Sequence, residues 1–187
     1  MPEWQDQEIL QWIEAAKNGD ADSFGFIYEQ YADIVFRFVY SQLSHFQDAE
    51  DLTEEVFFRI WRSLDSYEHK GIPFIAYIFR IARNAVIDHY RQAARSRNQI
   101  PFEEELIGHT KYEPEHQASL NSTQKEIRAR LKELREDYRN VLVLRFFSGL
   151  TTEETAQALG KTPGAVRVLQ HRALAALRKS ITGQLRT

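Results

Sequence analysis

Apolar side chains recur every three to four residues along most of the chain, a spacing typical of amphipathic α-helices. Proline and glycine, which interrupt helices, are scarce in the first half, and no alternation of apolar and polar residues indicates a strand. The pattern predicts an all-α protein, with first-half helices at Gln5 to Lys17, Ala21 to Ser44, Asp48 to Ser63 and Pro73 to Ala94.

A polar, acidic stretch at 96–118 breaks this pattern, because it contains Pro101, Gly108 and Pro114 and keeps no apolar period. Such a composition is typical of a flexible linker. Beyond it, the pattern predicts helices at Ser119 to Leu134, Glu136 to Phe147, Thr152 to Leu159 and Pro163 to Ile181. We therefore expect two small helical domains, at 5–95 and 119–182, joined by the linker.

The last two predicted helices form a helix-turn-helix signature. Residues 151–154, TTEE, supply an N-cap threonine and the acid of a capping box, and Gly160 can adopt the positive φ that ends a helix. Thr162 can cap the next helix, with Pro163 at its first position. The turn between the two helices is thus predicted by local chemistry.

The second of these helices has two contrasting faces. The packing face carries Val166, Leu169, Ala173, Ala176 and Leu177, and the opposite face carries Gly164, Arg167, Val168, His171, Arg172 and Ala175. Small residues allow close approach to a surface, and arginines suit guanine edges or phosphates. The pattern favours DNA binding, although an ordinary solvated helix pair with basic outer residues has the same pattern.

Charge is distributed very unevenly along the chain. Residues 121–187 carry 13 Lys and Arg against 6 Asp and Glu, a net of +7, whereas residues 1–120 have a net of −10. Within the acidic half, a local basic stripe is formed by Arg80, Arg83, Arg91, Arg95 and Arg97. Two basic surfaces are therefore predicted, separated by acidic ones.

Composition excludes several classes of protein. A chain of 187 residues can bury a core, and the absence of cysteine excludes disulfides and thiolate metal sites. The N-terminal sequence lacks the basic start and apolar run of a signal peptide, and no apolar stretch approaches a membrane span. Because no nucleophile elbow or phosphate loop is present, we expect a cytoplasmic protein without membrane insertion or nucleophilic catalysis.

The predicted helix at Asp48 to Ser63 carries an acidic stripe, because Asp51, Glu54 and Glu55 lie at i, i+3 and i+4. A solvated helix face explains this stripe equally well. A carboxylate metal site is disfavoured, because the Glu-x-x-His spacing occurs only at Glu113 to His116, across a proline. We expect neither a metal nor another cofactor.

The next helix interleaves aromatic residues, arginines and Asn84. This mixture suits single-stranded nucleic acid, because aromatic rings stack on unpaired bases and arginines follow the backbone. An alternative applies to the apolar positions, which can form the core seam of a helix bundle: Phe74, Ile78, Ile81 and Ala85.

Three segments together resemble the sigma-70 family of bacterial sigma factors, in its extracytoplasmic-function (ECF) subgroup. DAEDLTEEVF at Asp48 to Phe57 is similar to region 2.2, IARNAVIDHYR at Ile81 to Arg91 to regions 2.3 and 2.4, and Arg145 to Lys179 to region 4.2. The segments occur in the family's order, and the linker is too short for the extra domain of larger sigma factors. The resemblance covers most of the chain.

The resemblance implies core RNA polymerase, through its β′ and β subunits, and promoter DNA as partners. The β′ clamp helices would contact Asp48, Asp51, Glu54 and Glu55. The minus 10 element would contact Tyr77, Arg80, Arg83, Asn84, Asp88 and Arg91, while the loop from Leu64 to Ile72 receives a flipped base. The minus 35 element would contact Lys161, Arg167, Val168, His171, Arg172 and Arg178, with Arg145 and Lys179 at the backbone.

Two departures from the family pattern stand out: Tyr77 occupies a position where many members have Trp, and Glu54 one where Gln is common. The expected function is promoter-specific initiation without catalysis by the chain itself, and an anti-sigma partner fits the subgroup. Two rival interpretations stay open at this point. One is a helix-turn-helix regulator with a sensory or dimerising N-terminal domain, and the other is a helical enzyme that uses the acidic stripe with a metal.

Overall fold

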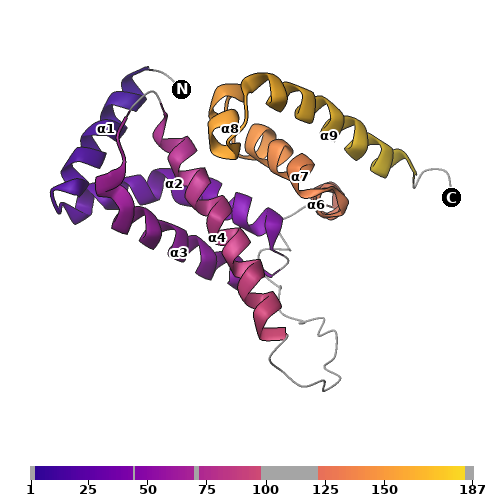
Figure 1. Ribbon diagram of the computed structural model, residues 1–187, viewed down its shortest axis with the longest axis horizontal. Coiled ribbons are helices and arrows are strands. Elements are labelled where there is room, and N and C mark those ends of the chain that lie inside the picture. Colours follow the sequence, from indigo (N-terminus) through magenta and orange to yellow (C-terminus); the bar gives the residue numbers. More distant parts are fainter. Residues whose placement is uncertain (1–2, 44, 70–71, 98–121, 184–187) are drawn as a thin grey trace.

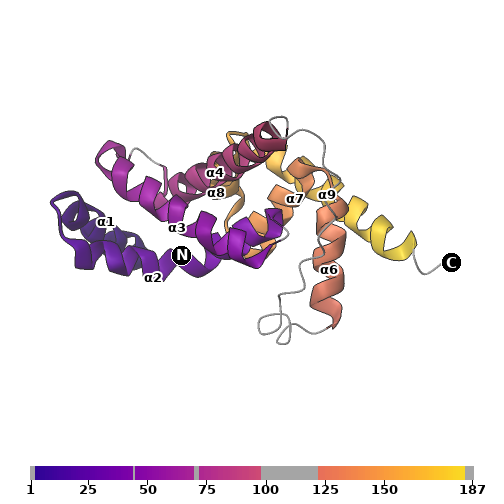
Figure 2. The same ribbon diagram turned by 90° about the horizontal axis from the view of Figure 1, so that it is seen from below.

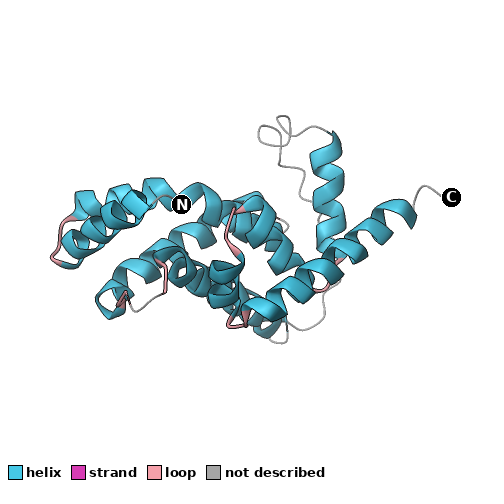
Figure 3. Ribbon diagram, turned by 90° about the horizontal axis from the view of Figure 1, so that it is seen from above, coloured by secondary structure: helices cyan, strands magenta, loops and turns pink. Residues whose placement is uncertain are grey.

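The computed structural model describes residues 3–43, 45–69, 72–97 and 122–183, and within these ranges it contains helices and connecting loops but no strand (Figure 3). The all-α prediction is therefore confirmed for the described residues. The helices before the predicted linker are α1 (Glu3–Lys17), α2 (Ala21–Gln42), α3 (Phe46–Ser63) and α4 (Phe74–Arg97), with a 3-10 turn, η1 (Leu64–Ser66), after α3.

The first turn of the fold follows from its sequence, Asn18-Gly19-Asp20. Gly19 adopts φ +92°, a conformation that costs glycine little. Asp20 then caps α2, because its carboxylate accepts hydrogen bonds from the Asp22 amide (3.2 Å) and the Ser23 hydroxyl (2.5 Å). The chain thus reverses direction, and α1 packs along α2.

The N-terminal helices share one apolar core. Val35 and Phe38 of α2, Ile60 of α3 and Ile78 of α4 are at most 1% exposed. Phe38 meets Phe79 of α4 edge-on, with ring centroids 5.4 Å apart. The core-seam interpretation of α4 is confirmed for Phe74, Ile78 and Ala85, which are buried, while Ile81 is half-buried.

The C-terminal helices are α6 (Ser122–Glu133), α7 (Glu136–Leu142), α8 (Thr152–Leu159) and α9 (Pro163–Gly183). The segment predicted as one helix from Glu136 to Phe147 is helical over that whole span, but it changes at Val143 from α7 to a π-helical turn, η2 (Val143–Phe147). Its wider hydrogen bonding includes Ser148 N donating to Val143 O at 2.9 Å. Apolar periodicity continues through the turn, so the sequence pattern did not predict it.

The helix-turn-helix chemistry agrees with the prediction in detail. Thr151 and Glu154 form the capping box of α8: the Glu154 amide donates to Thr151 Oγ1 (3.1 Å) and the Thr151 amide to Glu154 Oε2 (2.6 Å). Gly160 has φ +62° at the end of α8, and Thr162 Oγ1 accepts from the Ala165 amide to cap α9. The angle between the two helices is therefore set by local hydrogen bonds.

The N-terminal and C-terminal helices pack against each other. α8 contacts α4, while η2 and α6 contact α2. Figure 1 shows α4 with α3 on one side and the C-terminal helices on the other, and Figure 2 shows α8 next to α4. Accordingly, residues 74–79 of α4 are all buried, a run that no one-sided surface helix would have.

Predicted and observed helix boundaries agree within three residues apart from the division at Leu142. α4 continues to Arg97, two residues into the predicted linker, and the predicted positions Ser44 and 98–121 lie outside the described residues. None of the described helices combines the length and apolarity that crossing a membrane requires.

Candidate functional site

The outer face of α3 carries the acidic residues that the sequence singled out. Asp48, Asp51, Glu54 and Glu55 are all exposed, while Leu52 and Val56 of the same helix are buried in the core. Gln47 donates to Asp51 Oδ1 at 3.2 Å. A continuous negative surface therefore runs along the first half of the helix, as the i, i+3, i+4 spacing predicts.

The same face continues as an aromatic patch, which sequence reasoning did not identify by residue. Phe58 is 55% exposed and Trp61 is 38% exposed. Trp61 meets Phe24 of α2 edge-on, with ring centroids 4.8 Å apart, and these residues line an open apolar groove of about 350 Å³. The spacing of Phe58, four residues after Glu54, was the signal that could have located the patch.

Arg59 links this face to α4. Its Nε donates to Glu55 Oε1 at 2.8 Å, and its NH1 donates to Asp88 Oδ2 at 2.9 Å. The hydrogen bonds from Arg59 to Glu55 and then to Asp88 raise the pKa of the Arg59 guanidinium. Sequence reasoning missed this residue, because Asp88 is 29 positions away.

On α4, four of the six candidate minus 10 residues are exposed along the helix: Arg80, Asn84, Asp88 and Arg91. They follow a helical spacing of four, four and three residues, so they form one row. The structure brings these four side chains together on the surface. The other two candidates occupy different environments.

Tyr77 is only 5% exposed, so it is not a free stacking platform in this arrangement. Its hydroxyl donates to Ser63 O at 2.9 Å and lies 2.7 Å from Ser63 Oγ. The Arg80 guanidinium lies 5.4 Å from the Tyr77 ring centroid. Tyr77 thereby ties α4 to the end of α3 and supports the side chain of Arg80.

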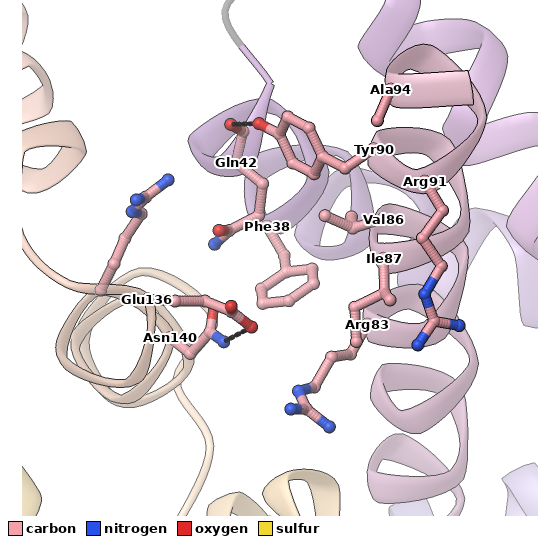
Figure 4. Close-up of a pocket in the computed structure, with 11 residues that line it drawn as sticks. Phe38, Gln42, Arg83, Val86, Ile87, Tyr90, Arg91, Ala94, Glu136 and Asn140 are labelled. Carbon is pink, nitrogen blue, oxygen red and sulfur yellow. Dashed lines mark hydrogen bonds between the residues drawn. The ribbon is translucent and has the colours of Figure 1, made fainter. Parts of the chain in front are cut away.

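Arg83 points toward the C-terminal helices. It lines a cavity of about 460 Å³ whose walls come from α2, α4 and α7, including Arg139 and Asn140. Figure 4 shows Glu136 and Asn140 opposite α4 in this cavity. The Nε atoms of Arg83 and Arg139 and the Oδ1 of Asn140 have no hydrogen-bond partner within the protein. This contact between the two helix groups therefore contains polar atoms that no protein group satisfies.

The described residues between α3 and α4, which leave out 70–71, pack around aromatic side chains. Tyr67 is 4% exposed, donates through its hydroxyl to Ile72 O (2.9 Å), and lies 4.9 Å from Phe74 between ring centroids. The adjoining cavity, also lined by Glu154 of α8, has a volume of about 50 Å³. That space suits water molecules and is too small for a nucleobase.

The outer face of α9 is open. Arg167, Val168, His171, Arg172 and Arg178 are exposed, and only Val166 and Ala173 of this helix are buried. Arg167 lies 3.4 Å from Glu153 of α8, and Lys161 lies 3.9 Å from Asp137. All six candidate minus 35 residues are thus on the surface of the helix-turn-helix.

Arg145, expected at the DNA backbone, turns inward. Its Nε donates to Gln170 Oε1 at 3.2 Å, and its NH1 donates to Leu150 O. It thereby connects η2, the loop after it, and α9. Leu174 is an apolar residue on the outer face that the predictions did not include, with 41% exposure. No group of three or more His, Asp and Glu residues suited to a metal ion occurs in the described parts of the chain.

Comparison with known proteins adds an independent finding. Residues 27–96 match the family model for sigma-70 region 2, and residues 124–177 match that for sigma-70 region 4. ECF RNA polymerase sigma factor BldN of Streptomyces coelicolor is 32% identical over 95% of this chain and 67% of its own length. ECF RNA polymerase sigma factor ShbA of Streptomyces griseus is 36% identical over 89% of this chain and 91% of its own length.

Solved structures agree on the fold. CnrH in complex with the cytosolic domain of CnrY matches with a TM-score of 0.70 at 23% identity, over 92% of this chain and 96% of that one. The sigma factor RpoE of Bartonella quintana, in complex with the anti-sigma factor NepR, matches with a TM-score of 0.66 at 23% identity, over 85% and 96%. With these matches and relatives, the chain belongs to the sigma-70 family, in its ECF group of RNA polymerase sigma factors.

Proposed function

We propose that this sigma factor, which directs promoter-specific initiation by RNA polymerase, divides its work among the outer faces of α3, α4 and α9. The two domains would be 5–95 and 119–182, joined by 96–118. The observation that carries the proposal is the exposed stripe of α3, acidic at first and aromatic after Glu55. An acidic and apolar face suits a basic, amphipathic partner helix better than it suits DNA.

The stripe would bind the clamp helices of the β′ subunit. Asp48, Asp51, Glu54 and Glu55 supply charge that steers association, while burial of Phe58 and Trp61 supplies apolar contact. The groove between Phe24 and Trp61 would receive an apolar side chain of the partner. The β subunit would be contacted elsewhere on the chain.

The exposed row on α4 would follow the melted minus 10 strand. Arg80 and Arg91 suit phosphates, and Asn84 can hydrogen-bond a base edge. Tyr77 would not contact the strand itself, and its ring would hold the Arg80 guanidinium in position. A flipped base would enter the loop around Tyr67 only after α8 and its Glu154 move away, because the present cavity is too small.

The outer face of α9 would bind the minus 35 element as duplex. Arg167, Val168, His171 and Arg172 would lie in the major groove, with Lys161 and Arg178 nearer to phosphates. Affinity for promoter DNA would fall steeply with salt, because counterions released from phosphates contribute much of the binding free energy.

Polymerase would supply the chemistry of transcription, so the chain itself would not be an enzyme, and the complex would act in the bacterial cytoplasm. Both solved relatives were captured with a partner protein, for RpoE an anti-sigma factor. An anti-sigma factor of this chain would cover the α3 stripe. The rival interpretation, a helix-turn-helix regulator with a sensory or dimerising N-terminal domain, does not explain why the α3 stripe combines acidic and aromatic residues.

The decisive test measures binding to purified core polymerase and run-off transcription from genomic fragments. Asp51→Arg with Glu54→Arg should abolish both activities, because it reverses charge in the middle of the stripe without touching the Glu55 to Arg59 hydrogen bond. The matched control is Glu29→Arg with Asp33→Arg, which makes the same charge change on the exposed face of α2. Unchanged core binding in the α3 variant would refute the proposal.

A further inference from the structure

A row of alternating charges connects the polymerase-binding face of α3 to the DNA-binding row of α4. Arg59 donates to Glu55 through Nε and to Asp88 through NH1, using a separate nitrogen for each carboxylate. The second oxygen of Asp88, Oδ1, lies 3.7 Å from Arg91 NH1. The order Glu55, Arg59, Asp88, Arg91 therefore alternates negative and positive charge across two helices.

The ends of this row belong to different surfaces. Glu55 is on the stripe proposed to bind polymerase, and Arg91 is in the row proposed to follow the minus 10 strand. The side chains are 36% exposed at Arg59, 46% at Glu55, 50% at Asp88 and 70% at Arg91. Because all four groups are accessible, a charged partner can compete for either end of the row, and exposed pairs of this kind exchange readily.

We propose that Arg59 is a positioning residue that couples polymerase binding to minus 10 binding, an inference that rests on the function proposed above. A polymerase cation at Glu55 displaces the Nε of Arg59. The guanidinium then turns its fork fully to Asp88, and both carboxylate oxygens are occupied. Arg91 loses its competing carboxylate and is free to contact a DNA phosphate.

The coupling operates in both directions, as linkage requires. When a phosphate draws Arg91 away, Asp88 becomes a stronger acceptor for Arg59. The hydrogen bond from Arg59 to Glu55 then weakens, and Glu55 is more available to the polymerase. Asp88 also repels DNA less while Arg59 neutralises it. A chain that binds one partner therefore binds the other more tightly.

The experiment measures the Kd of the full chain for core polymerase with and without a single-stranded oligonucleotide. The oligonucleotide carries the non-template minus 10 strand of a promoter found by run-off transcription. The coupling is the Kd without the oligonucleotide divided by the Kd with it. Arg59→Gln should lower this ratio about two- to fivefold, the range expected for exposed ion pairs. Coupling from other parts of the chain is common to all variants.

Arg62→Gln is the matched control, since it removes the same charge from the exposed side of the same helix. Arg62 lies over the Phe58 ring rather than in the row, so the coupling ratio should stay at the wild-type value. Arg59→Lys keeps the charge but lacks the fork, and it should lose coupling as Arg59→Gln does. Thermal unfolding midpoints measured alongside report any purely structural effect of each substitution.

Failure of the inference and failure of the proposed function give different results. If the wild-type chain does not bind core polymerase, the proposed function is wrong. If it binds polymerase and the oligonucleotide, but Arg59→Gln keeps the full ratio or Arg59→Lys restores it, the bridge through Arg59 is overturned.

Discussion

The two helices proposed to contact DNA differ in how much of their surface the fold leaves open. On α9, only Val166 and Ala173 are buried. On α4, residues 74–79 are buried on every side, because α2 and α3 cover one side and α8 covers another. The outer face of α9 is thus already open in the chain by itself, whereas part of the surface of α4 is covered by the C-terminal helices.

This difference means that the two proposed promoter contacts have different conformational requirements. The proposed binding at α9 would need no rearrangement of the backbone, so its cost would be limited to fixing side chains. For residues 74–79 of α4 to take part in the proposed minus 10 contact, α8 would have to move away, and the cavity at Arg83 lies between α4 and the neighbouring α7. Three polar atoms in this cavity lack protein partners. Separation of α4 from α7 would give Arg83 access to water or phosphate.

The largest expected effect is on stability, and it comes from the core of the N-terminal helices beneath the cavity at Arg83. Phe38 is 1% exposed and packs on Phe79, so Phe38→Ala should lower the free energy of unfolding of the N-terminal helices by about 3–5 kcal/mol. Tryptophan fluorescence reports only this half, because Trp4, Trp12 and Trp61 are the chain's tryptophans. Circular dichroism reports both halves, and we expect a second, less shifted transition. Coincident shifts would indicate that the halves unfold as one unit.

A bulky residue placed between α8 and α4 should expose the part of α4 that α8 covers. Ala158 is 3% exposed and lies one turn after Glu154 on the α8 face toward α4. Ala158→Arg should overpack this contact by about 1–3 kcal/mol and raise the free chain's affinity for a minus 10 oligonucleotide about tenfold. Gln157→Arg adds the same charge at the neighbouring exposed position and should have little effect. Equal affinities in the two variants would mean that α8 does not mask α4.

A substitution on α9 should act without any conformational step. Arg172→Ala should weaken promoter binding by about 1–3 kcal/mol and relax sequence preference in the upstream element alone. Competition binding with promoter fragments randomised in each element measures both quantities. Lys132→Ala on α6 provides the matched loss of one positive charge. A change of preference in the downstream element would contradict the separation of the two surfaces.

The smallest effect concerns pH and the end of α9. The Ser180 hydroxyl, which donates to Glu133 at 2.9 Å, and the Arg130 guanidinium lower the pKa of the Glu133 carboxyl below its usual 4.5. The stabilisation is therefore present above the unfolded pKa and lost as pH falls through the folded one. Carboxyl titration by NMR should give a higher Glu133 pKa in Ser180→Ala. An unchanged midpoint would show that the hydroxyl has no influence.

Local chemistry made much of the fold predictable from sequence. Thr151, Glu154 and Gly160 form their cap and turn with neighbours at most four residues away, so their roles are visible in the sequence. The acidic stripe of α3 and the open face of α9 likewise follow from helical periodicity. These features involve a single helix or a single turn, and no knowledge of packing is needed to derive them.

Features that depend on tertiary placement were not predictable. The Arg59 bridge requires knowing that α3 and α4 lie side by side, and the burial of Tyr77 depends on the ends of both helices. Arg145 carries the charge of a DNA-binding residue, yet Gln170 and the Leu150 carbonyl hold it inside. The covering of α4 by α8 joins segments separated by the linker, and no local pattern encodes that contact.

The π turn at Val143–Phe147 has an evolutionary consequence. Such a turn has i to i+5 hydrogen bonds, and here it continues α7 and ends at the loop that leads to α8. A one-residue deletion within it would restore the regular spacing of hydrogen bonds and leave the register of the preceding helix intact. We therefore expect length differences of a single residue among homologous chains to be tolerated at this turn.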